Sequence, residues 1–204
     1  MQGRVSSPLQ TPKSCMSTYI PLGKNPGSPE ERQELIARRE AEEERLAGLD
    51  LAQVRSRIID YLLSRKGYSQ EELETEREFR VELPEGPFTV RADIILKEGG
   101  VRFMVVKCAL SSLESWERHS IAFCRVVEPY QIPYAVITDG ERARVMNILK
   151  KGEVSEGLES IPSKREAPAI VRALATAPYP EEKRVKEKRM LYAFDGIKCP
   201  AEKK

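Results

Sequence analysis

Two charged side chains on neighbouring predicted strands could carry out chemistry together. Asp93 lies in one apolar segment and Lys107 ends the next, with the turn Gly99-Gly100 between them. Residues i and i+2 of a strand share a face, so an acid two positions before such a lysine would bring both groups to one point. Two carboxylates and a lysine so placed suit metal-dependent phosphodiester hydrolysis, because the carboxylates hold a divalent metal that activates water. In this chain Val105 occupies the position two before Lys107.

The elements that must position these side chains follow from hydrophobic periodicity. Asp50 can cap a helix whose apolar residues recur at helical spacing until Gly67 ends it. Alternation and turn residues then predict three antiparallel strands, Leu73–Leu83, Phe88–Leu96 and Val101–Ala109. The next elements are a helix from about Ser112 to before Pro129, a strand Tyr134–Ile137 buried on both faces, and a strand Ala143–Ile148.

The remaining segments are predicted to be extensions of this core. The proline content of residues 1–27 predicts a flexible leader. Ser28 and Glu31 form a capping box around Pro29, which predicts a charged helical arm over 28–48. The core domain then spans 49–163. Residues 164–204 are expected to form a helical C-terminal extension that includes a charged helix.

Composition limits the class of protein. The 204 residues carry 34 basic and 32 acidic side chains, and 40% are hydrophobic, which argues against a disordered or fibrous chain. No apolar run approaches the roughly 18 residues of a membrane span, so we expect a cytoplasmic protein without membrane contacts. Four cysteines without a CxxC pair and one histidine exclude a zinc ribbon. No GxxxxGK[ST] occurs, so the chain by itself cannot be an ATP-driven motor.

Four motifs carry a family resemblance: Lys66-Gly67-Tyr68 at a helix end, Arg91-x-Asp93, the strand ending in Lys107, and Ile132-Pro133-Tyr134-Ala135-Val136-Ile137-Thr138-Asp139-Gly140. Over about Leu51–Ser163 they resemble the N-terminal nuclease domain of the type I restriction enzyme R subunit, a PD-(D/E)XK fold. The resemblance implies an α/β restriction-endonuclease-like fold. Its mixed, mostly antiparallel central sheet would be flanked by helices, with an N-terminal helical arm and a C-terminal helix.

The resemblance also implies roles for particular residues. Asp93 would be the first metal carboxylate and Lys107 the catalytic lysine, with Mg²⁺ as cofactor if the protein is active and no cofactor otherwise. Val105 stands where the family has its second metal carboxylate, which predicts a degenerate metal site. Glu114 or Glu117 from the following helix could replace the missing acid, and Glu76 or Glu78 upstream could contribute an accessory ligand.

Structural interpretations stand beside these catalytic ones. Asp93 could pair with Arg91 or Lys107 as an internal salt bridge. The amine of Lys107 could instead lie in solvent at the strand end. Cys108 and Cys124 are interpreted as buried thiols rather than reactive ones.

The helix after the third strand carries candidate phosphate contacts. Arg118 and Arg125 are seven residues apart and so share a helix face that could meet DNA, and Arg91 is a third candidate. Trp116 is interpreted as a core residue, and His119 as a surface or cap residue rather than a base. Asp139-Gly140 is interpreted as a turn.

Three functional hypotheses follow. The first is a nucleic-acid-associated module, degenerate at the second carboxylate, that binds DNA weakly or recruits a partner without cutting. The second is an active Mg²⁺-dependent deoxyribonuclease with a relocated carboxylate. The third is a protein-interaction adaptor that uses the arm at 30–47 or the C-terminal helix. Since the net charge is only +2, DNA binding would depend on a local patch.

Overall fold

A computed structural model of the chain describes residues 28–150, 153–174 and 179–196. The chain divides into two compact units, residues 1–38 and 39–204. Helix α1 (Pro29–Ala47) begins as predicted, because the Ser28 hydroxyl accepts the backbone N–H of Glu31 at 3.1 Å. The predicted leader, residues 1–27, lies outside the described residues.

The second unit is built on a mixed sheet of six described strands in the order β1-β2-β3-β4-β5-β6. Neighbouring strands are antiparallel except for the parallel pair β3 and β4. The strands are β1 (Leu73–Leu83), β2 (Gly86–Glu98), β3 (Val101–Cys108), β4 (Tyr134–Thr138), β5 (Ala143–Asn147) and β6 (Val154–Glu156). The predicted mixed, mostly antiparallel sheet is therefore confirmed, and only the short, exposed β6 was not predicted.

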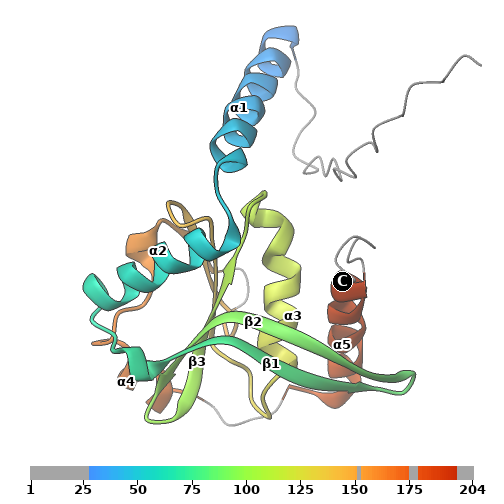
Figure 1. The fold of residues 1–204 in the computed structure, drawn as a ribbon. Coiled ribbons are helices and arrows are strands. Elements are labelled where there is room, and N and C mark those ends of the chain that lie inside the picture. The colour runs from blue at the N-terminus through green and yellow to red at the C-terminus, as the bar shows by residue number, and fades with distance from the viewer. Residues whose placement is uncertain (1–27, 151–152, 175–178, 197–204) are drawn as a thin grey trace, which may run out of the picture. The chain divides into compact units, whose positions relative to one another are not determined.

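Helices lie on both faces of this sheet (Figure 1). Helices α2 (Leu51–Ser64) and α4 (Ala167–Arg172) lie on one face, and α3 (Glu117–Val126) and α5 (Glu181–Gly196) lie on the other. The described residues also form three short 3-10 helices, η1 (Gln70–Glu72), η2 (Leu113–Trp116) and η3 (Leu158–Ser160). Among the described residues, no helix is long and apolar enough to cross a bilayer.

The alternation of β2 and β3 divides the core into two layers. Ile94 and Val106 point to the α2 side, whereas Ile95 and Val105 point to the α3 and α5 side. Strand β4 is buried on both faces, as its continuous apolar sequence predicts. The parallel β3–β4 pair is connected through η2 and α3, which places the start of α3 beside the carboxyl ends of both strands.

Candidate functional site

Asp93 of β2 and Lys107 of β3 lie together at one end of the sheet. The antiparallel register pairs Ile94 with Val106, so the next residues on each strand are Asp93 and Lys107. Lys107 Nζ donates to Asp93 Oδ2 at 2.8 Å, and the Cys108 backbone N–H donates to the same oxygen at 2.9 Å. The side chains are 9% exposed for Asp93 and 18% for Lys107. The predicted juxtaposition is thus present, and it takes the form of the internal salt bridge.

The ammonium of Lys107 is enclosed rather than placed in solvent. Its Nζ lies 4.9 Å from the ring centroid of Trp116, which is a cation–π contact. Trp116 packs against the apolar core on the α3 side, as expected for a core residue. The interpretation of Lys107 as a solvent-exposed strand end is therefore wrong.

Val105 shares its face of β3 with Lys107 and supplies only methyl groups to the site. The side chain is 5% exposed and belongs to the core layer under α3. Together with Asp93, Lys107 and His119 it lines a cavity of about 10 Å³. A space of that size is at the lower limit for one water molecule. A larger hollow of about 430 Å³ lies elsewhere, against Val126, Val127 and α5, and shares no lining residue with this cavity.

Glu76, a predicted upstream metal ligand, lies opposite Asp93 in the register of β1 and β2, but its carboxylate pairs with two arginines instead. The pairs Thr75 with Ile94 and Arg77 with Ala92 bracket it on β1. Its backbone has φ 52°, a left-handed conformation rare for residues other than glycine. Its Oε1 pairs with Arg55 Nη1 at 2.8 Å and Arg91 Nη1 at 3.6 Å.

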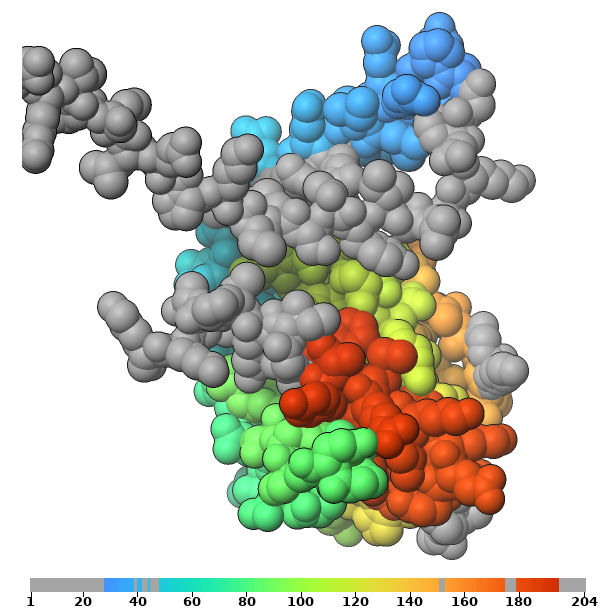
Figure 2. All heavy atoms as spheres, turned by 90° about the vertical axis from the view of Figure 1, so that its right-hand side faces the viewer, coloured from blue at the N-terminus to red at the C-terminus, as the bar shows by residue number. Residues whose placement is uncertain are grey.

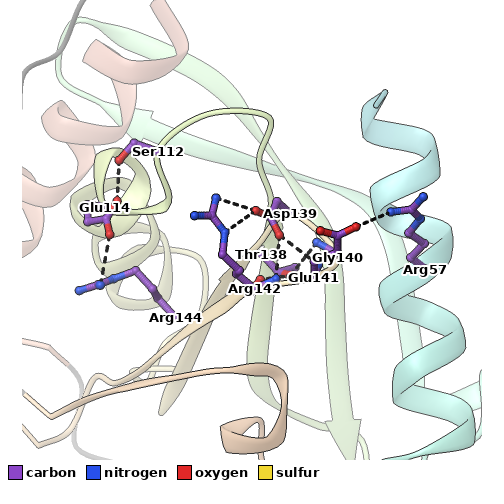
Figure 3. Close-up of polar contacts among 9 residues, drawn as sticks. All are labelled: Arg57, Ser112, Glu114, Thr138, Asp139, Gly140, Glu141, Arg142 and Arg144. Carbon is purple, nitrogen blue, oxygen red and sulfur yellow. Dashed lines mark hydrogen bonds and ion pairs between the residues drawn. The ribbon is translucent and has the colours of Figure 1, made fainter. Parts of the chain in front are cut away.

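The two predicted replacement ligands, Glu114 and Glu117, bind Arg144 of β5, and Figure 3 shows the contact of Glu114. Arg144 Nη1 lies 3.3 Å from Glu114 Oε1, and Arg144 Nε donates to Glu117 Oε1 at 2.7 Å. Glu114 also accepts from the Ser112 hydroxyl at 2.5 Å. Among the described residues, no cluster of three or more histidine, cysteine, aspartate or glutamate side chains could hold a metal ion. Mg²⁺ needs several well-placed oxygens, so this donor set does not fit it.

The segment after β4 forms a turn that is held by its own side chains (Figure 3). Asp139 is fully buried, and its Oδ1 accepts the backbone N–H groups of Glu141 at 3.0 Å and Arg142 at 2.8 Å. Arg142 Nε donates to the second carboxylate oxygen at 2.9 Å. Gly140 has φ 90°, which its lack of a Cβ permits. The interpretation of Asp139-Gly140 as a turn is confirmed.

His119 is buried, so its assignment as a surface or cap residue is wrong. Only 5% of it is exposed, and its ring packs edge-on against Trp116 at 5.5 Å and Phe194 at 5.5 Å. Burial, followed by the neighbouring Lys107 ammonium, lowers the pKa of His119 from 6.5 to about 4. Its Nδ1 has no hydrogen-bond partner among the described residues. The imidazole is therefore neutral near pH 7.

Arg118 and Arg125 share a face of α3 as predicted, but α5 supplies an acid to that face. Glu187 Oε2 lies 2.5 Å from Arg118 Nη2, and Arg125 Nη1 donates to Glu187 Oε1 at 2.9 Å. Glu187 is not among the residues that the sequence predicts for the site. One signal was available, because Glu187 and Leu191 are four apart and so share a face of their helix.

The two described cysteines are inert, buried thiols, as interpreted from the sequence. Burial, followed by the Asp93 carboxylate, raises the pKa of the Cys108 thiol to about 12. Burial also raises the pKa of Cys124 well above its ordinary value. Neither supplies the thiolate that a nucleophile needs at neutral pH.

Comparison with known proteins relates the chain to one family of restriction enzymes. A family model described as "Type I restriction enzyme R protein N terminus" matches residues 52–162, which is more than half of the chain. The matched segment runs from α2 to the residues just before α4 and contains Asp93, Val105 and Lys107. No curated protein and no solved structure matches the chain.

Proposed function

Because this chain belongs to the family of type I restriction enzyme R protein N termini, we propose that it is a nucleic-acid-associated module with a restriction-endonuclease-like fold and a degenerate metal site. It binds DNA through a local basic patch and does not cut it. Asp93 and Lys107 are the remnants of the catalytic set.

The observation that carries this proposal is the bonding of the Asp93 carboxylate. Asp93 Oδ2 accepts from Lys107 Nζ and from the Cys108 N–H, and Val105 on the same face offers no oxygen. The charges of Asp93 and Lys107 cancel, so the pair leaves no negative charge to hold a divalent cation. A second carboxylate at position 105 would restore that charge.

The experiment on the metal site replaces Val105 with Glu and, as the matched neutral control, with Gln. Both variants bury a polar group in an apolar layer and are expected to melt at lower temperature than the wild type. We expect Mg²⁺ or Mn²⁺ to raise the Tm of Val105→Glu, because a bound ligand stabilises the folded state, and to leave Val105→Gln and wild type unchanged. Equal responses of the two variants would contradict the proposed decay of a metal site.

A plasmid cleavage assay decides between the degenerate site and an active nuclease. We expect no Mg²⁺- or Mn²⁺-dependent nicking by the wild-type protein. Metal-dependent cleavage that both Asp93→Ala and Lys107→Ala abolish would overturn the hypothesis of a degenerate metal site. It would favour a relocated carboxylate such as Glu114 or Glu117.

DNA binding is tested directly with a fluorescent duplex. Arg91 and Arg118 keep 56% and 42% of their side chains exposed, so both can reach phosphates. We expect affinity to fall steeply between about 50 and 200 mM salt, and Arg91→Ala to reduce the slope of log K against log salt by about 0.9. Arg80→Ala on β1 is the matched control, because Arg80 is exposed and is not one of the predicted DNA contacts.

A protein-interaction adaptor is the second candidate, and one feature of α1 favours it. Leu35 and Ile36 are adjacent apolar residues on a strongly charged helix, and they are 53% and 50% exposed. Exposed apolar neighbours of this kind are typical of a docking face. If no duplex binding is detectable even at low salt, this adaptor function replaces DNA binding as the preferred reading.

A further inference from the structure

Helix α5 places a buried carboxylate between the two α3 arginines that DNA would contact. The Glu187 side chain is only 5% exposed and pairs with Arg118 at 2.5 Å and Arg125 at 2.9 Å. The Tyr179 hydroxyl lies 3.4 Å from the same carboxylate, and Arg125 lies over the Tyr179 ring at 4.9 Å. Two guanidinium groups around one carboxylate form an anion site. In the folded chain the Glu187 carboxylate occupies that site.

The same helix also packs against the aromatic side chains beside Asp93 and Lys107. Phe194 of α5 packs against Trp116 at 6.2 Å and against His119 at 5.5 Å, and Trp116 lies under the Lys107 ammonium. Figure 2 shows α5, in red, lying on the surface between the green β1–β2 hairpin and the yellow part of α3. Removing α5 would therefore free both arginines from Glu187 and uncover the faces of Trp116 and His119 that Phe194 contacts, and His119 lines the cavity beside Asp93 and Lys107.

The contact between α5 and α3 is poorly satisfied for a permanent one. Within the described residues, buried polar side-chain atoms without a hydrogen-bond partner lie on these two helices, and Glu187 Oε2 is set apart from them by its ion pair with Arg118: the others are Arg118 Nη1, His119 Nδ1, Ser120 Oγ, Arg125 Nε and Arg184 Nε. Such atoms lose water on burial without gaining a partner, which opposes docking of the helix. Leu191 is the one fully buried apolar side chain in the described part of α5, and Met190 and Phe194 add only partly buried contacts to offset this.

We propose that α5 is a displaceable cover whose Glu187 occupies a phosphate-binding site formed by Arg118 and Arg125. DNA phosphate takes the place of the carboxylate when α5 leaves α3. This inference rests on the proposed DNA binding and adds its regulation. It agrees with the position of α5 outside the segment, 52–162, that matches the family model.

The test uses the full-length chain with Glu187→Gln, which removes the charge that pairs with both arginines. Glu182→Gln is the matched control, because Glu182 lies on the same helix and is exposed. Hydrogen exchange of α5 amides without DNA measures the fraction of molecules with α5 released. Fluorescence anisotropy with a short duplex measures affinity, and hydrogen exchange on the complex shows whether bound DNA keeps α5 released.

The two measurements should change by the same factor. If only the released state binds DNA, the apparent Kd is inversely proportional to the released fraction, so the affinity rises by the same factor as that fraction. We expect Glu187→Gln to raise α5 exchange and DNA affinity each on the order of tenfold. Glu182→Gln should leave both close to wild type, and DNA should speed α5 exchange in the wild type while slowing exchange in α3.

Three results overturn the inference, and they are distinguishable. Equal α5 exchange in the two variants would show that Glu187 does not hold the helix. Faster exchange in Glu187→Gln without tighter binding would show that α5 does not compete with DNA. Absence of binding in all proteins, with α5 demonstrably released, would overturn the proposed function and DNA as the ligand together. Should Glu187→Gln fail to fold, Phe194→Ala releases the other end of α5. In that variant too, α5 exchange and DNA affinity should rise by the same factor.

Discussion

Lowering the pH from 7 to 5 should destabilise this protein through one residue. His119 is the chain's single histidine, and its ring is buried against Trp116, Phe123 and Phe194. Burial and then the Lys107 ammonium lower its pKa from 6.5 to about 4 in the folded state. An imidazole in the unfolded chain has no such constraint and titrates near 6.5.

The size of the effect follows from the two pKa values. Between pH 6.5 and 4 the unfolded chain binds a proton that the folded chain does not, so the free energy of unfolding falls as the pH falls. Going from pH 7 to pH 5, the difference in protonation removes about 2 kcal/mol of stability. Carboxylates titrate mainly below this window, near pH 4, so the change between pH 7 and 5 reports on His119.

Urea unfolding at pH 7 and at pH 5 measures this difference. The control is His119→Phe, since a phenyl ring can join the same aromatic neighbours and cannot titrate. We expect the variant to unfold at nearly the same urea concentration at both pH values. A wild-type free energy of unfolding that is equal at pH 5 and 7, or an equal pH dependence in wild type and variant, would refute the burial argument.

Three further predictions concern stability and are measured by denaturant unfolding. Lys107→Met should cost about 3 kcal/mol because it leaves the buried Asp93 carboxylate without its cation. Adding Asp93→Asn should recover most of that loss, and an unchanged stability of Lys107→Met would contradict a stabilising ion pair. Gly140→Ala should cost about 1–2 kcal/mol, since a φ of 90° is strained for a residue with a Cβ, while the new Cβ would meet Arg57 only at an ordinary contact distance of 3.5 Å; an unchanged midpoint would contradict this strain. Ile137→Ala should cost about 2–5 kcal/mol by opening a cavity in β4, and a cost below 1 kcal/mol would mean that the strand is not packed on both faces.

Most of the fold could be predicted from the sequence because local patterns determine it. The capping box at Asp50 starts α2, and the apolar run Tyr134–Ile137 identifies a strand buried on both faces. The edge strand β6 was missed for a physical reason. All three of its residues are exposed, so it lacks the hydrophobic signal and is held by its pairing with β5.

The candidate site was predictable only along single strands and helices. Strand spacing placed Val105 and Lys107 on one face, and the order of the strands brought Asp93 beside them. The partners of the other charged residues come from distant segments. Arg144 reaches Glu114 and Glu117 across 30 and 27 residues, and Glu187 reaches Arg125 across 62. The same long-range packing buries His119 under α5, which no local pattern indicates.

These pairings determine what kind of DNA binding the protein can show. Lys107 is paired with Asp93, Arg91 with Glu76, and Arg118 and Arg125 with Glu187. In the proposed DNA complex a phosphate would therefore compete with a carboxylate at each of these positions, a buried one at Lys107, Arg118 and Arg125 and the half-exposed Glu76 at Arg91. Such an exchange gains only the difference between two similar ion pairs, whereas the release of counterions from DNA still favours binding. Affinity should accordingly be modest, strongly dependent on salt, and more sensitive to removing Glu187 than to adding a surface lysine.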